Sequence, residues 1–178
     1  METGFKIDIS EDIINVPYRE LIGSLMYLST ISRPDILFVT SYLSRYLDKH
    51  TNSLWKAVKR VLRYLRGTKD LTLKFKKNTE DINIKAYTDA DWTGDIEDST
   101  SDFVIYYRGS LISWSSRKQT SVALTTAEAE YAASASCGAE LLYVLGLATD
   151  FERKQLKCIM KIDNQSTINM LRNWQNTK

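Results

Sequence analysis

A chain of 178 residues, 43% of them hydrophobic, can bury the core of one or two domains. Its net charge of +2 is small, and its two cysteines, Cys137 and Cys158, are too few and isolated for a disulfide framework or a zinc site. The single histidine, His50, argues against Ser-His or Cys-His catalysis. No apolar run of membrane-spanning length is evident, so we expect a soluble, intracellular protein, cytoplasmic or nuclear.

Charge is distributed unevenly along the chain. Residues 1–78 hold 14 Lys/Arg against 8 Asp/Glu, a net of +6, whereas residues 79–178 hold 10 against 14, a net of −4. A basic part joined to an acidic part suggests one surface for a polyanion and another for a cation. Ordinary variation of surface charge is the alternative explanation.

The first part of the chain has helical spacing. In "YRELIGSLMYLSTIS", from Tyr18, apolar residues recur every three or four positions, which predicts a helix. In "SRPD", Ser32 can cap a second helix, while Pro34 and Asp35 suit its first turn, so this helix is expected from Pro34 to about Leu47. The apolar stripe of the first helix comprises Leu21, Ile22, Leu25, Leu28 and Ile31.

A third helix is expected after "HTNS", ending near Gly67, and it separates apolar from basic residues. The following "TLKFKK" alternates like an edge strand. Between residues 56 and 77, nine basic residues stand against one acid, Asp70, which predicts a phosphate-binding surface, with a merely solvated face as the alternative. The apolar stripe comprises Leu54, Val58, Val61, Leu62 and Leu65; the basic surface comprises Lys56, Lys59, Arg60, Arg63, Arg66 and Lys74.

After the linker-like "KKNTED" the pattern changes to strands, so two domains are expected, residues 1–78 and 79–178. "INIKAYTDADW" predicts a strand, and "STSDFVIYYRGSLISWSS" a hairpin that turns at Gly109-Ser110. A long helix (126–151), a strand in "KCIMKID" and a short helix in "QSTINMLRNW" follow. This order fits an α/β mixed sheet whose first and last strands are parallel neighbours joined by a crossover helix. The helix stripe is expected at Tyr131, Ala135, Gly138, Leu142 and Leu145.

Three acids meet in this topology. Asp89 falls near the carboxyl end of the first strand and Asp163 ends the last one, so parallel pairing places them side by side. Glu130, one turn into the long helix, would lie over them. Clustered carboxylates repel one another, and Mg²⁺ or Mn²⁺ is a suitable counter-charge. Two such ions about 3.5–4 Å apart support phosphodiester cleavage.

Each acid also has a structural explanation. Glu128 fits the capping box Thr125-x-x-Glu128 better than a metal site. Asp163 could simply cap the last helix. The nearby acids Asp91, Asp95, Glu97 and Asp98 are typical loop residues. From the residues alone, a metal site and a set of capping or solvated acids both remain open.

Several long motifs resemble one known family. "YTDADWTGD", "STSDFVIYYRGSLISWSSRKQTSVALTTAEAEYAA" and "IDNQSTI" resemble the ribonuclease H domain of copia-type LTR retrotransposon Pol polyproteins. "YRELIGSLMYLSTISRPDILFVTSYLSRYL" and "WKAVKRVLRYLRGT" resemble the preceding reverse transcriptase segment, its thumb and connection. The resemblance extends from Pro17 onward.

The resemblance implies a ribonuclease H-like α/β fold preceded by a small helical segment. It implies Mg²⁺-dependent cleavage of the RNA strand of RNA–DNA hybrids, with a two-metal site. The family's three acids match Asp89, Glu130 (not Glu128) and Asp163. Implied partners are RNA–DNA hybrid or other duplex nucleic acid and the other segments of a parent polyprotein, with no membrane.

The resemblance is incomplete. The chain stops at "RNWQNTK", where similar proteins continue to a fourth acid, and Met1 stands within what resembles mid-polymerase sequence. We therefore expect a C-terminally truncated relic or an engineered fragment, weakened or inactive as an enzyme. The alternatives are an inert nucleic-acid-binding remnant and a fragment with no selected role. Family members tend to have glycine where Asp102 stands, a change that would strain a turn or be tolerated.

Overall fold

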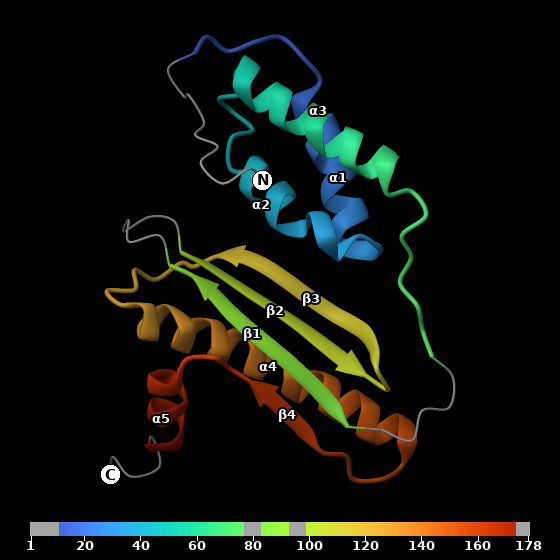
Figure 1. Cartoon of the computed structure of the whole chain (residues 1–178), viewed down its shortest axis with the longest axis vertical. Helices are drawn as coiled ribbons and strands as arrows, with labels where there is room; N and C mark the ends of the chain where they lie inside the picture. The colour runs from blue at the N-terminus through green and yellow to red at the C-terminus, as the bar shows by residue number, and fades with distance from the viewer. Residues whose placement is uncertain (1–10, 77–82, 93–98, 174–178) are drawn as a thin grey trace. The chain divides into compact units, whose positions relative to one another are not determined.

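The chain divides into two compact units, Met1–Leu73 and Lys74–Lys178. The computed structural model describes residues 11–76, 83–92 and 99–173 (Figure 1). The division falls a few residues before the boundary that the change of sequence pattern predicts. The first unit is helical, and the second combines a sheet with helices.

The helical unit contains α1 (Tyr18–Ile31), a 3₁₀ turn η1 (Pro34–Ile36), α2 (Leu37–Ser44) and α3 (Asn52–Gly67). The first and third helices are confirmed. The second is shorter than expected, because beyond Ser44 the backbone bonds tighten to three-residue turns, as in Tyr46 N to Leu43 O (3.2 Å). The helices share a core of Tyr18, Ile22, Leu25, Ile36, Leu43, Leu54, Val58 and Val61.

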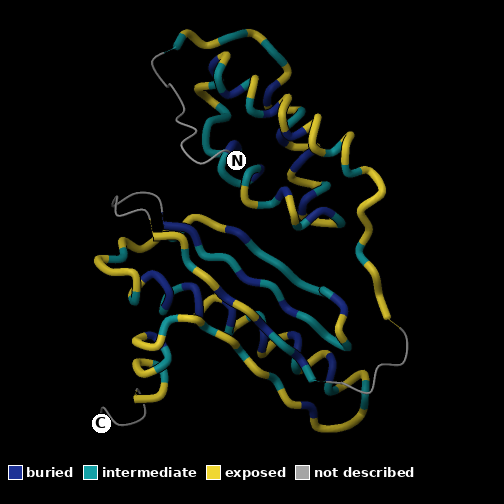
Figure 2. Tube along the Cα trace, viewed as in Figure 1, coloured by how far each residue is buried: buried dark blue, intermediate teal, exposed yellow. Residues whose placement is uncertain are grey.

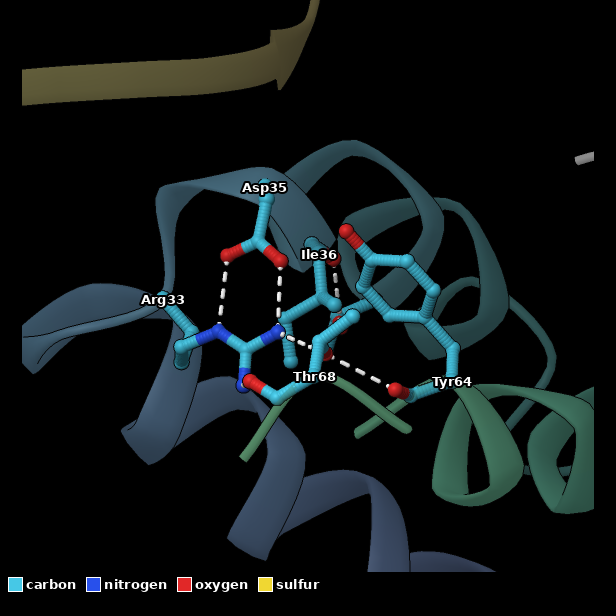
Figure 3. A network of polar contacts seen from close by, with 6 residues as sticks. Arg33, Asp35, Ile36, Tyr64 and Thr68 are labelled. Atoms are coloured by element: carbon cyan, nitrogen blue, oxygen red, sulfur yellow. Dashed lines mark hydrogen bonds and ion pairs between the residues drawn. The ribbon is translucent and has the colours of Figure 1, made fainter. Parts of the chain in front are cut away.

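A buried arginine joins the segment after α1 to the end of α3 (Figure 3). Arg33, 7% exposed, donates from Nε and Nη2 to the two carboxylate oxygens of Asp35 at 2.9 and 2.7 Å. Its Nη2 also donates to Thr68 Oγ1 at 2.6 Å, and Thr68 Oγ1 donates to Tyr64 O at 2.8 Å. The Arg33 guanidinium lowers the pKa of Asp35. Asp35 therefore acts as an ion-pair partner, and Ser32 ends α1 instead of capping the next helix.

The predicted edge strand in "TLKFKK" is wrong for its described residues, 72–76, which form neither strand nor helix. The amide of Lys76 donates to the side-chain Oγ of Ser110 at 3.0 Å, not to a strand carbonyl. A segment with alternating apolar and polar residues forms a strand only where its backbone can pair with a neighbouring strand. The position of Lys77 lies outside the described residues.

The second unit is built on a mixed four-stranded sheet in the order β3-β2-β1-β4. The strands are β1 (Ile84–Asp91), β2 (Thr100–Tyr107), β3 (Ser110–Lys118) and β4 (Cys158–Lys161). Neighbours β1, β2 and β3 are antiparallel, whereas β1 and β4 are parallel, which confirms the predicted pairing.

The hairpin between β2 and β3 turns at Arg108-Gly109, one residue earlier than predicted. Both residues have positive φ, 51° and 68°. Two consecutive left-handed residues are what a tight two-residue hairpin requires, and glycine adopts this conformation without strain. Arg108 is held there by bonds to Glu152, including Nε to Oε1 at 3.0 Å.

Helix α4 (Thr126–Glu152) connects β3 to β4 along one face of the sheet, and α5 (Gln165–Asn173) packs against α4 (Figure 1). Buried and exposed stretches alternate along α4 (Figure 2). Most of the stripe predicted for α4 is wrong, because Leu142 is 67% exposed while its neighbour Leu141 is buried, and only Leu145 of the stripe packs against the core. Apolar residues surround this helix, so their spacing could not select the inner face. The buried residues on that face include Ala133, Cys137, Leu141, Val144 and Ala148.

Contrary to the sequence-based expectation, α4 is long and apolar enough to cross a membrane, judged by length and composition alone. The core helix of a soluble domain can meet the same criterion. Here the buried face of α4 packs with Ile84, Ala86 and Ile105 of the sheet in one hydrophobic cluster. One face of α4 therefore belongs to the core of this unit, while Leu142, Tyr143 and Leu147 on its other side are exposed.

A candidate metal centre of three carboxylates

Asp89, Glu130 and Asp163 form a compact cluster, hereafter the carboxylate cluster. One carboxylate oxygen from each residue lies within 4.8 Å of the others. The proximity expected from the sequence is therefore observed, although the three residues are far apart along the chain.

The parallel pairing of β1 with β4 brings the two aspartates together. The strands run in register from Ile84 opposite Cys158 to Tyr87 opposite Lys161. Asp89 and Asp163 each follow this last pair by two residues, so both stand at the same edge of the sheet. This edge, outside the carboxyl ends of parallel strands, is where open α/β sheets bind ligands.

The start of α4 positions Glu130. The Glu128 amide donates to Thr125 Oγ1 at 3.2 Å, and the Leu124 amide donates to Glu128 Oε2 at 2.7 Å. The predicted capping role of Glu128 is confirmed, with the difference that its carboxylate accepts from Leu124 and not from Thr125. Glu130, two residues on, instead lies at the cluster and is 7% exposed.

The capping explanation for Asp163 is wrong. The amide of Thr167 donates to Asn164 Oδ1 at 3.1 Å, so the neighbouring asparagine caps α5. Thr167 Oγ1 also donates to Ala127 O at 3.2 Å, which ties α5 to the first turn of α4. The Asp163 carboxylate is therefore left at the cluster.

Glu130 has an electrostatic environment that favours a cation. Its Oε2 is buried and has no hydrogen-bond partner. Burial, reinforced by the charges of Asp163 and Asp89, raises the pKa of Glu130 to about 7. A buried, unpartnered carboxylate oxygen is costly, and a bound divalent cation would satisfy it. The donor set fits Mg²⁺ or Mn²⁺, which prefer oxygen ligands.

Asp102 is a fourth acid beside the cluster that the sequence analysis did not place there. It lies directly opposite Asp89 in the β1–β2 pairing. Its Oδ1 is buried without a hydrogen-bond partner, and burial, with smaller effects of Asp89 and Asp91, raises its pKa. The positive-φ non-glycine residues in the described part of the chain are Arg108 and Arg153, so of the two alternatives for Asp102, a strained turn or a tolerated change, the strained turn is not found.

The other acids near Asp89 in the sequence are not part of the carboxylate cluster or lie outside the described residues. Asp91 is the exposed last residue of β1 and does not belong to the carboxylate cluster. Asp95, Glu97 and Asp98 lie outside the described residues. The signal that could have identified Asp102 was a charged residue inside the strand pattern "STSDFVIYY".

Five members of the basic surface lie on α3, and the sixth, Lys74, falls in the second unit. Leu54, Val58 and Val61 are buried in the helical unit, whereas Leu62 of the predicted apolar stripe is 39% exposed. Lys59 Nζ lies 5.9 Å from the centre of the Trp55 ring. All six predicted members of the basic surface are exposed: Lys56, Lys59, Arg60, Arg63, Arg66 and Lys74.

A mixed sheet with acids at the ends of its parallel strands defines an α/β protein with a candidate cation site. The chain is 38% identical over 164 residues to a "Retrovirus-related Pol polyprotein from transposon TNT 1-94" of Nicotiana tabacum, and 42% identical over 135 residues to that "from transposon RE2" of Arabidopsis thaliana. These matches cover 91% and 75% of the chain, but only 12% and 9% of those polyproteins. The chain belongs to the family of copia-type retrotransposon Pol polyproteins.

A third relative is comparable in length to the matched region. It is the "Secreted RxLR effector protein 161" of Plasmopara viticola, 38% identical over 132 residues, which span 73% of this chain and 92% of the relative. No protein-family model matches the chain. No solved structure matches it either.

Proposed function

We propose that the second unit is a metal-dependent ribonuclease H that cleaves the RNA strand of RNA–DNA hybrids. The observation that carries the proposal is the carboxylate cluster with the buried, unpartnered Oε2 of Glu130. Membership of the Pol family supports a retroelement origin, and the motif resemblance supports this activity in particular.

In this proposal Asp89, Glu130 and Asp163 hold Mg²⁺ or Mn²⁺. The bound ions would activate a water and stabilise the leaving oxygen of the phosphodiester. The residues of the chain provide the geometry: the parallel strands fix the two aspartates, and the capped start of α4 fixes the glutamate. Burial of Glu130 keeps one side of the site dry, which strengthens its attraction for a cation.

Strand-specific cleavage tests the proposal. A hybrid labelled on its RNA strand and a second hybrid labelled on its DNA strand should be incubated with the protein and Mn²⁺. We expect cleavage of the labelled RNA only, and none in EDTA. Equal cutting of both strands would indicate a different nuclease, and no cutting by metal-bound protein would leave the second candidate function below.

The second candidate function is nucleic-acid binding without catalysis. It is supported by the exposed basic surface, five of whose members follow one side of α3 while the apolar side of that helix lies in the core. Basic side chains spaced along a helix bind phosphates without reading sequence. This function would persist even if the carboxylate cluster did not support cleavage.

We expect the double substitution Arg60→Glu and Arg63→Glu to weaken duplex binding for all sequences alike. Two lost phosphate contacts should also reduce the slope of log affinity against log salt by about 2. Fluorescence anisotropy of labelled duplexes at several salt concentrations measures both effects.

The matched control changes net charge equally at two exposed lysines that are not part of α3, Lys49 and Lys154. Its affinity should change much less than that of the α3 variant. An equal loss in both variants would mean that overall charge, and not the basic surface, governs binding.

A further inference from the structure

Beside the carboxylate cluster, the same two strands carry an aromatic ring and a cation. Tyr87 and Lys161 are direct partners in the β1–β4 register. Lys161 Nζ lies 5.2 Å from the centre of the Tyr87 ring. Tyr87 is 41% exposed, and Lys161 is exposed as well.

These side chains lie on the sheet face opposite α4. Ile84 and Ala86 pack with α4 in the core, and residues of a strand alternate between faces, so Tyr87 and Asp89 share the other face. There the Tyr106 ring meets the Tyr87 ring edge-on, with centres 6.0 Å apart and planes at 86°. A hollow of about 340 Å³ beside them is lined by Asn83, Lys85, Tyr87, Val104, Tyr106 and Gly109.

The chemistry of this face suits a nucleic-acid strand. Aromatic rings stack on bases, and lysine attracts phosphates without requiring a particular sequence. The acids of the face are gathered at one end, at Asp89 and Asp102, while Lys161 stands opposite Tyr87, one step back along the strands, and Lys85 stands a further step back, opposite Ile159. Consider a nucleic-acid strand with one phosphate at a cation in the carboxylate cluster. It would meet these lysines only on the side of the cluster that runs back along β1 and β4.

Spacing supports the same occupant. Tyr87 precedes Asp89 by two residues, and Lys161 precedes Asp163 by two, a step of about 6.6 Å along a strand. Neighbouring nucleotides of a strand advance about 3.4 Å along a duplex axis. A nucleic-acid strand bound at the cluster would reach the tyrosine and the lysine within about two nucleotides.

We propose that Tyr87 and Lys161 form a binding subsite for the nucleic-acid strand adjacent to the scissile phosphate, Tyr87 by stacking on a base and Lys161 by contacting a phosphate. The inference rests on the proposed nuclease function, whose site it extends. Both are positioning residues for the substrate, because they lie next to the metal-binding acids and not among them.

Binding without cleavage tests the subsite. The full chain should be titrated with a labelled RNA–DNA hybrid in Ca²⁺, and again in EDTA, by fluorescence anisotropy. We expect Tyr87→Leu to weaken binding about tenfold, while Tyr87→Phe, which keeps the ring, retains wild-type affinity. Lys161→Gln should weaken binding and reduce the salt slope by about 1. The control Lys154→Gln, at an exposed position beyond the end of α4, should leave the slope unchanged.

The two proposals fail in different ways. If cleavage is absent but Tyr87→Leu still weakens binding relative to Tyr87→Phe, the nuclease function fails and the subsite stands. If cleavage occurs, Tyr87→Leu and Lys161→Gln should raise KM with little effect on kcat. Unchanged binding and KM in both variants would overturn the subsite, and would leave this face to some other partner such as a peptide.

Discussion

Replacing Asp89 by asparagine should abolish the stabilisation of the protein by Mn²⁺ or Mg²⁺. The substitution removes a negative ligand from a cluster whose oxygens lie within 4.8 Å of one another, while it keeps the size of the side chain. A ligand that binds only the folded state stabilises it by about 2.7 kcal/mol at 100 times its dissociation constant. At about 4–8 °C for each kcal/mol in a unit of this size, that corresponds to a rise in Tm of roughly 10–20 °C. Thermal melts with and without Mn²⁺ measure the shift.

Two conservative variants provide the matched controls. Asp91→Asn changes an exposed acid two residues along the same strand, and Glu128→Gln changes the capping residue two positions before Glu130. Both should retain most of the metal-induced shift. Hybrid cleavage should disappear with Asp89→Asn and persist in the two controls. Equal metal-induced shifts in all four proteins would mean that Asp89 does not bind the metal and is a solvated acid of β1.

The sequence predicted what depends on local pattern and on the order of elements. Helix α3 was predictable because its apolar and basic residues separate cleanly onto two sides. The parallel pairing of β1 with β4 followed from strand order and a crossover helix, and the meeting of Asp89 with Asp163 followed from that pairing. The capping role of Glu128 was predictable from the four-residue motif Thr125-x-x-Glu128.

The sequence could not predict features that depend on tertiary contacts, such as which side of an apolar helix is buried against the sheet. Helix α4 has apolar residues all round, so only the packed sheet decides that Leu141 is buried and Leu142 exposed. The segment "TLKFKK" alternates like a strand, but its described residues pair with no neighbouring strand. Asp102 became notable only when strand register placed it opposite Asp89. In each case the outcome depends on contacts between residues that are far apart in the sequence.

Replacing Glu130 by glutamine should stabilise the metal-free protein and destroy its response to metal. The folded protein binds the Glu130 proton more tightly than the unfolded chain does, because burial and the neighbouring acids raise its pKa from 4.5 to about 7. Stability of the wild type without metal is therefore expected to fall as pH rises through this window, and to stay low above it. The full loss is about 3 kcal/mol, from about 1.4 kcal/mol for each unit of pKa.

Glutamine carries no charge at any pH in this range. Stability of the Glu130→Gln variant without metal should therefore decrease much less than that of the wild type as pH rises. In EDTA at pH 8 the variant should be the more stable protein, and with saturating Mn²⁺ at the same pH the order should reverse. Urea denaturation between pH 4.5 and 8 measures both comparisons. Glu128→Gln, at the exposed capping position, should keep the wild-type pH dependence. A Glu130→Gln protein that is less stable than the wild type in EDTA at pH 8 would contradict the prediction. The ionised glutamate would then be better accommodated than its neutral isostere, despite its burial and the neighbouring acids.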